Sequence, residues 1–121
     1  MSKKTLVIGA VENPDRYAYK AAVSLVNHGH QIELFGSRKG TIKGVSIQTE
    51  FPEKIDNLDS VTLYLNPTNQ QGYYDKILAL QPKRVIFNPG TENPEFEEKL
   101  EKAGIQAEEA CTLVLLSIGN Y

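Results

Sequence analysis

The fold is decided by the stretch "TLVIGAVENPDRYAYKAAVSLVNHGHQIELF", Thr5–Phe35. It opens with "TLVIG", a short apolar run ending in glycine, which is typical of a strand buried on both faces. Apolar residues then recur at helical spacing before His28, namely Ala18, Ala21, Ala22, Leu25 and Val26. The apolar run "QIELF" predicts a second strand. Because a right-handed crossover makes such strands parallel, this order predicts the start of an open parallel sheet.

The ends of that first helix have candidate signals of their own. Asn13 is a residue type that caps helices, and Pro14 fits a first turn, where its missing N–H costs nothing. Gly29 follows the last periodic residue and is well placed to end the helix. We therefore expect a helix that begins just after Asn13 and reaches His28.

Strands and helices continue to alternate through the rest of the chain. Strands are expected at "VSIQT", an exposed edge, and at "VTLYL", "RVIFN" and "IQAE". One helix should reach about Leu80, and another should run from Pro94 to Ala103, capped by Asn93 and stopped by Gly104. The segment "GSRKGTIKG" is expected to be a loop, and "ACTLVLLSIGNY" follows as a tail. The pattern predicts one α/β domain over residues 1–121, with strand order 3-2-1-4-5(-6) and "VTLYL" beside "TLVIG".

Composition excludes several classes of protein. The 121 residues are 40% hydrophobic, which suits one compact domain, and the net charge of −2 provides no basic footprint for nucleic acid or an anionic membrane. The apolar runs are far shorter than the roughly 20 residues that span a bilayer. A single cysteine, Cys111, excludes an internal disulfide and a multi-cysteine metal site. The apolar part of "MSKKTLVIGA" is too short for a signal peptide, so we expect a cytoplasmic protein.

Five loops leave the carboxyl ends of the predicted strands: "GAVENP", "GSRKG", "NPTN", "NPGTENP" and "EACT". In open parallel sheets, ligands bind beside this edge of the sheet. Proline stiffens a loop and cannot donate a backbone hydrogen bond, while asparagine offers amide groups to a helix end or a ligand. Plain strand-to-helix turns would explain one such loop. Several along one edge predict a binding site.

The residues in these loops narrow the ligand. Gly9, directly after the first strand, would let a phosphate approach the end of the next helix, although the full G-x-G-x-x-G pattern is absent. NAD binding also calls for an acidic residue near the end of the second strand. Arg38 and Lys39 stand there instead and suit a phosphate on the ribose. This favours NADP or the 3′-phosphate of coenzyme A (CoA) over NAD.

Taken in order, "VIGAVENPDRYAYK", "GSRKGTIKG", "VTLYLNP", "KRVIFNPGTENPE" and "EACTLV" resemble the small stand-alone CoA-binding proteins. These are similar to the Rossmann-like CoA-binding domain of the succinyl-CoA synthetase alpha subunit. The resemblance covers nearly the whole chain and implies a Rossmann-like three-layer α/β/α fold with an open, mainly parallel sheet. It also implies the positions that contact CoA, carried over residue by residue: beside Gly9, these are Ala10, Val11 and Arg16 for the phosphates, Ser37 and Arg38 for the adenosine phosphate, and Asn66, Pro67, Pro89, Gly90 and Cys111 for the pantetheine side.

Two departures from the family pattern bear on affinity. Val11 stands where the family commonly has serine, so a hydroxyl contact to phosphate is missing and backbone N–H groups remain. Gly36-Ser37 stands where the family often has Asn-Pro. These departures imply weaker binding of CoA or binding of a relative of CoA.

Three classes of function stay open. Binding of CoA or an acyl-CoA without catalysis is preferred, because binding loops are present and no nucleophile–base pair is found, Glu92 having no such partner. The alternative is an enzyme, either an NADP-dependent oxidoreductase or the CoA-binding subunit of an acyl-CoA-processing enzyme. The third is a structural or regulatory partner of another subunit. We expect no nucleic acid, membrane or metal as partner, and a homodimer or partner subunit stays possible.

Overall fold

The computed structural model describes residues 2–121, and the strands of this range form one sheet. Its order is β3-β4-β2-β1-β5-β6-β7, and every neighbouring pair is parallel except β3 and β4. The strands span β1 (Thr5–Ile8), β2 (Ile32–Phe35), β3 (Thr41–Ile42), β4 (Val45–Gln48), β5 (Ser60–Leu63), β6 (Arg84–Phe87) and β7 (Gln106–Glu109). Because the four-residue strands are parallel, the loops that follow them leave the sheet along one edge.

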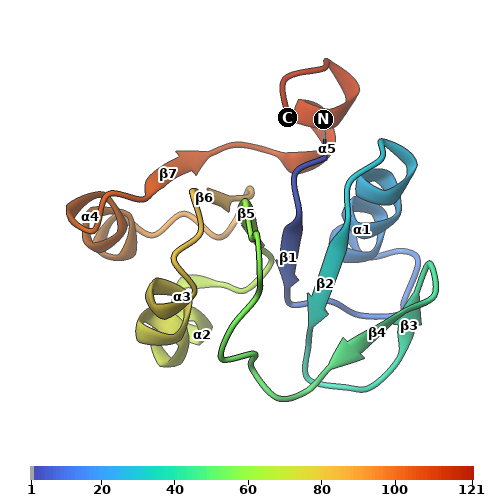
Figure 1. The fold of residues 1–121 in the computed structure, drawn as a ribbon, viewed down its shortest axis with the longest axis horizontal. Coiled ribbons are helices and arrows are strands. Elements are labelled where there is room, and N and C mark those ends of the chain that lie inside the picture. The colour runs from blue at the N-terminus through green and yellow to red at the C-terminus, as the bar shows by residue number, and fades with distance from the viewer. Residues whose placement is uncertain (1) are drawn as a thin grey trace.

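Helices cover both faces of the sheet and make three layers (Figure 1). On one face lie α1 (Tyr17–Asn27) and α5 (Thr112–Ser117). On the other lie α2 (Pro67–Gln70), the 3₁₀ turn η1 (Gln71–Tyr73), α3 (Tyr74–Leu80) and α4 (Pro94–Lys102). This confirms the predicted Rossmann-like α/β/α fold with a mainly parallel sheet.

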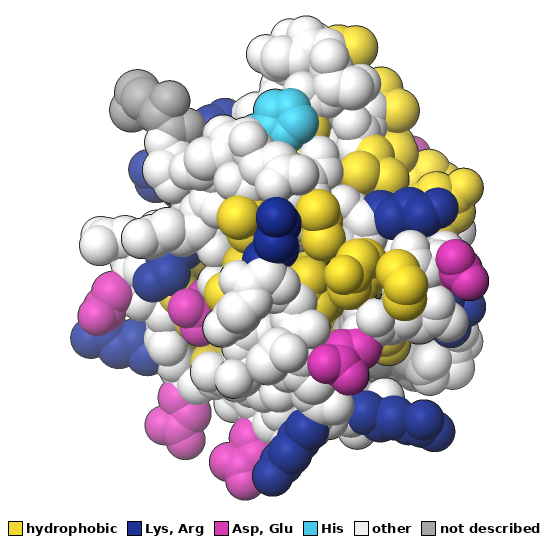
Figure 2. Space-filling view, turned by 90° about the vertical axis from the view of Figure 1, so that its right-hand side faces the viewer, with side chains coloured by type: hydrophobic (Ala, Val, Ile, Leu, Met, Phe, Trp, Pro, Cys, Tyr) yellow, Lys and Arg dark blue, Asp and Glu magenta, His cyan; other side chains and the backbone are white. Residues whose placement is uncertain are grey.

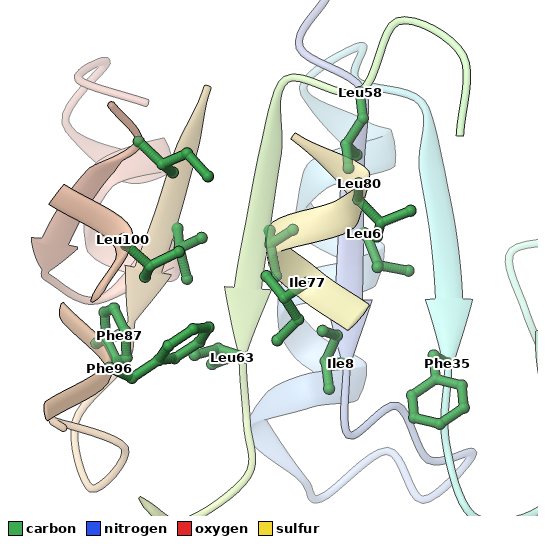
Figure 3. Close-up of a cluster of buried hydrophobic side chains, with 13 residues drawn as sticks. Leu6, Ile8, Phe35, Leu58, Leu63, Ile77, Leu80, Phe87, Phe96 and Leu100 are labelled. Atoms are coloured by element: carbon green, nitrogen blue, oxygen red, sulfur yellow. The ribbon is translucent and has the colours of Figure 1, made fainter. Parts of the chain in front are cut away.

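The core shows why these segments form the central strands. Leu6 and Ile8 of β1 belong to the cluster under α3 and α4, whereas Val7 between them belongs to the cluster under α1 and α5. A strand buried on both faces is apolar over most of its length, as Leu6, Val7 and Ile8 are in β1. Figure 3 shows the larger cluster, in which Phe87, Phe96, Ile77, Leu63 and Leu100 point into the space between sheet and helices.

The predicted strand order corresponds to β4, β2, β1, β5, β6 and β7, and one strand is added to it. Thr41 and Ile42, expected in a loop, form β3 and pair antiparallel with Ser46 and Val45. Lys43 and Gly44, with φ of 52° and 78°, make the tight turn of this hairpin. Ile42 is buried at 1% exposure, so this addition to the sheet is fixed by packing.

The expected start of α1 was wrong. The helix begins at Tyr17, and Arg16 is its cap residue without any side-chain capping bond. Asn13 instead closes a turn ahead of the helix. Its Oδ1 accepts a hydrogen bond from the Asp15 N–H at 2.9 Å, and its carbonyl accepts one from Arg16 at 3.1 Å. An asparagine side chain supports such turns as readily as a helix cap.

Two further segments differ from expectation. The segment before Leu80 is divided into α2, η1 and α3 rather than one helix. The tail after Cys111 forms α5, whose Leu116 is buried against α1. The predicted ends at Gly29 and Gly104 are confirmed, with φ of 85° and 80° just after α1 and α4.

The two edges of the sheet are formed by short or polar strands. β4 pairs with β2 through two residue pairs only, and β3 closes its outer side. At the other edge, β7 is polar, with Gln106 and Glu109 exposed.

Figure 2 shows basic and acidic side chains scattered among hydrophobic ones on the face that it presents. Among residues 2–121, no helix combines the length and apolar character that crossing a bilayer requires.

Candidate functional site

A pocket of about 580 Å³ lies at the carboxyl edge of the sheet, between the loops that follow β1, β2 and β5. Of the predicted site residues, it is lined by Gly9, Ala10, Val11, Arg16, Ser37 and Asn66. The structure thus brings the first, second and third predicted loops to one cavity. Sequence reasoning missed several further lining residues: Phe35, Gly36, Thr49, Tyr64, Leu65, Asn69 and Tyr73.

Gly9 allows β1 to turn sharply into this pocket. Its φ is 94°, and a Cβ atom there would lie 2.9 Å from the backbone oxygen of Tyr64. Both Gly9 and Ala10 donate their N–H groups to the carbonyl oxygen of Phe35, at 2.9 and 3.0 Å. These two N–H groups are therefore used within the fold, and a phosphate would have to be met further along, toward Arg16 and the first turn of α1.

The second loop crosses directly over the first. A Cβ on Gly36 would lie 2.1 Å from the Ala10 carbonyl oxygen, so only glycine fits without movement of the loop. This close crossing gives a physical reason for glycine at position 36. Farther along, the Glu12 carboxylate accepts a hydrogen bond from the Thr41 N–H at 2.8 Å and ties the two loops together.

Arg38 lies on this second loop but outside the pocket lining. Its side chain is exposed, and its neighbour Ser37 is the residue of "GSRKG" that reaches the pocket together with Gly36. The structure therefore places Arg38 beside the cavity rather than in its wall. Any contact with a ligand would involve a group that extends out of the pocket toward solvent.

The repeated Asn-Pro pairs serve two structural purposes. Asn66 and Asn93 cap α2 and α4 through their Oδ1 atoms, with Pro67 and Pro94 in the first turns. Asn88 is buried at 2% exposure and bridges three segments. Its Nδ2 donates to Thr62 Oγ1 at 2.6 Å and to the Leu63 carbonyl at 2.9 Å, and its Oδ1 accepts from the Thr112 N–H at 2.9 Å.

A second buried network holds the loop after β5 against the loop after β6. Gln70, fully buried, donates from Nε2 to the carbonyl oxygens of Leu65 and Thr91, both at 2.8 Å. Its Oε1 accepts a hydrogen bond from Asn93 Nδ2, which also donates to the Tyr74 hydroxyl. The pocket walls formed by these loops are therefore braced from beneath by satisfied polar groups.

The other predicted residues fall around smaller hollows or outside them. Pro89 and Cys111 line a cavity of about 240 Å³ with Tyr17, Tyr64, Asn88 and Leu113. A third hollow, of about 370 Å³, lies along the start of α1 between the other two and includes Arg16, Tyr17 and Tyr64 in its wall. Pro67 and Gly90 line none of the three. The Gly90 N–H donates a hydrogen bond to Glu92 Oε1 at 2.8 Å, so Gly90 and Glu92 stabilise the turn that contains them.

Tyr64 is the residue common to all three hollows. Burial raises the pKa of its phenol to about 12, and hydrogen bonding with Thr112 and Thr62 opposes only part of that effect. The phenol is therefore neutral over the physiological range. The sequence offered one signal for it, a polar ring near the end of a buried strand, directly before the Leu65-Asn66 loop.

Groups for catalysis or metal binding are sparse around these hollows. Among residues 2–121, no three His, Cys, Asp or Glu side chains gather as a metal site would require. The Cys111 thiol is half-buried, and the lining of its cavity contains no histidine or carboxylate to act as its base. The arrangement is suited to holding a ligand.

Comparison with known proteins places this geometry in a family. Residues 3–117 match the family model described as CoA binding domain. No curated protein matches the chain. A crystal structure of an uncharacterized protein is 51% identical, with a TM-score of 0.97 over 100% of this chain and 99% of that one.

Two more distant structures share the fold. A protein from Thermus thermophilus is 22% identical, with a TM-score of 0.88 over 99% of this chain and 91% of that one. The dinucleotide-forming acetyl-coenzyme A synthetase 1 of Candidatus Korarchaeum cryptofilum is 16% identical, with a TM-score of 0.69 over 87% of this chain and 25% of that one. With the match over residues 3–117, the chain belongs to the CoA binding domain family.

Proposed function

We propose that the protein binds coenzyme A or an acyl-CoA at the carboxyl edge of its sheet and does not turn the ligand over alone. The observation that carries the proposal is the set of three adjoining hollows, which run from the loop after β2, past the start of α1, to Pro89 and Cys111. CoA is a long ligand with a nucleotide at one end and a thiol at the other. An elongated, divided site suits it.

The nucleotide end is assigned to the main pocket. The unpaired N–H groups at the start of α1, together with Arg16, favour the diphosphate. Ser37 and Arg38 on the neighbouring loop are then on the side where a ribose phosphate would emerge. Asn66, which the resemblance placed on the pantetheine side, lines this pocket with Asn69, and here both offer amides to the adenosine.

NADP remains the second candidate, because Arg38 and Lys39 suit its 2′-phosphate equally well. CoA is preferred because the hollows continue beyond the phosphate region to the apolar cavity of Pro89 and Cys111. A nicotinamide is polar and planar, whereas the pantetheine arm is a flexible chain.

Isothermal titration of the purified protein with CoA, dephospho-CoA, NADP and NAD tests the proposal. We expect CoA to bind most tightly, dephospho-CoA more weakly and NAD least. Binding of NADP without CoA would overturn it. Release of free thiol from acetyl-CoA, proportional to added protein and retained after repurification, would contradict the absence of turnover.

A further inference from the structure

The cavity at the end of the site adjoins the hollow along α1. Tyr17 and Tyr64 belong to the walls of both. Tyr17 is 68% exposed and is the first residue of α1, directly after Arg16. A chain that leaves the phosphate region past these two rings would therefore enter the cavity.

The lining of this cavity is apolar in its chemistry. Pro89, Leu113 and the rings of Tyr17 and Tyr64 supply most of the wall, with the thiol of Cys111. The one amide in the wall, that of Asn88, already makes hydrogen bonds to Thr62, Leu63 and Thr112. A charged or hydroxylated occupant would find few free partners here and would lose its hydration.

The volume limits the occupant as well. The cavity measures about 240 Å³. Roughly eight molecules of liquid water, at about 30 Å³ each, occupy the same volume. The end of the pantetheine arm would take part of that room, and a few carbon atoms of an acyl group would take the rest. A fatty acyl chain would extend beyond the cavity into solvent.

We propose that this cavity holds the acyl group of a short-chain acyl-CoA, so that the preferred ligand is a thioester with an apolar acyl group of about four carbons. The inference rests on the proposed binding of CoA. It adds that the protein distinguishes acyl-CoA from free CoA, through Leu113, Pro89 and Tyr17.

The test measures dissociation constants for free CoA and for acetyl-, butyryl-, hexanoyl- and palmitoyl-CoA. Burial of one methylene corresponds to about a fourfold change in affinity. Butyryl-CoA, with two more methylenes than acetyl-CoA, should therefore bind about 15-fold tighter than acetyl-CoA. The gain should end by hexanoyl-CoA, with none for palmitoyl-CoA.

Two opposite variants at Leu113 locate the effect. Leu113→Phe fills the cavity and should bring the affinity for butyryl-CoA close to that for free CoA. Leu113→Ala enlarges it and should move the preference from butyryl- to hexanoyl-CoA. Val114→Phe is the matched control, since Val114 is the next residue on α5, is 52% exposed and lines none of the hollows.

The outcomes separate this inference from the proposed function. Equal affinities for free CoA and every acyl-CoA would overturn the acyl site and leave CoA binding standing. A chain-length preference that both Leu113 variants retain unchanged would place the acyl group elsewhere and also overturn it. Absence of binding by every CoA compound would overturn both proposals together.

Discussion

Arg38 is exposed beside the main pocket, where a phosphate on the ribose would extend toward solvent. A hydrogen bond to a charged group contributes roughly 1.5–3 kcal/mol, so Arg38→Ala should weaken CoA binding about 10- to 150-fold. The same change should hardly affect dephospho-CoA, which lacks the 3′-phosphate. Titration of both ligands, with Lys83→Ala as an exposed control remote from the loop, makes the comparison. Equal losses for both ligands would show that Arg38 does not contact that phosphate.

Gly36 carries a second prediction at this scale. An added Cβ would lie 2.1 Å from the Ala10 carbonyl oxygen, so Gly36→Ala must push the two loops apart. Overpacking of this kind costs about 1–3 kcal/mol in the free energy of unfolding, and the displaced loop should also weaken ligand binding. Urea unfolding and titration with CoA measure both effects. Gly72→Ala is the control, because nothing lies within 4 Å of its Cβ position, and its stability should change by less than about 0.5 kcal/mol.

The role of a single residue could be predicted where it depends on neighbouring residues in the sequence. Gly9 follows a buried strand, and its positive φ is a property that sequence pattern can indicate. Gly36 and Tyr64 were missed because their roles arise only in the folded chain. Gly36 lies against the Ala10 carbonyl oxygen, and Tyr64 lines three separate hollows. For the loop asparagines the sequence left two roles open, a helix end or a ligand, and the Asn88 amide has a third one, since it holds β5 and α5 together.

At the scale of elements, the two capping asparagines should differ in their effect on stability. Asn66 is exposed and makes one capping bond, so Asn66→Ala should cost about 1 kcal/mol. Asn93 is 5% exposed and also bonds Gln70 and Tyr74. Because Asn93→Ala leaves buried partners unsatisfied, it should cost about 2–4 kcal/mol. Denaturation in urea measures both, and equal costs would show that the network beneath the loops contributes little.

Elements were predicted where periodicity is strong and missed where tertiary contacts decide. The central strands and α4 follow from apolar runs and from capping by Asn93. The start of α1 was placed too early because the Asn13 side chain accepts a backbone N–H, as a helix cap would, but uses that bond to close a turn ahead of the helix. β3 has two residues, and α5 has six, too few for a periodic signal. Both form because Ile42 and Leu116 have a core to pack against.

For the molecule as a whole, stability at alkaline pH should depend on Tyr64. Its folded-state pKa of about 12 lies above the ordinary 10.0, so the folded protein holds the phenolic proton more tightly than the unfolded chain does. The resulting stabilisation is complete below pH 10 and is lost as the pH rises from 10 to 12. One pKa unit corresponds to about 1.4 kcal/mol, so the loss is on the order of 2–3 kcal/mol.

Urea unfolding of wild type and Tyr64→Phe at pH 9 and pH 11 measures this effect. The variant should lose less stability between the two pH values than the wild type. Some dependence should remain, because burial also raises the pKa of Tyr121. Identical losses in the two proteins would show that Tyr64 does not carry the pH dependence.

The order of the sheet could be predicted at this scale because a parallel sheet with right-handed crossovers permits few arrangements. That several loops would lie along one edge could be predicted as well, since loops after parallel strands share it. The division of the space between them into three hollows could not. That division depends on where the rings of Tyr17 and Tyr64 lie, and no local pattern encodes it.

The two edges of the sheet have a consequence for self-association. An exposed strand edge is a template on which another chain can add a strand and begin to aggregate. Here one edge ends in the two-residue β3, and the other is β7 with the exposed carboxylate of Glu109. Two copies that met through β7 would set like charges against each other. Growth of a continuous sheet from copy to copy is thus discouraged at both edges of the sheet.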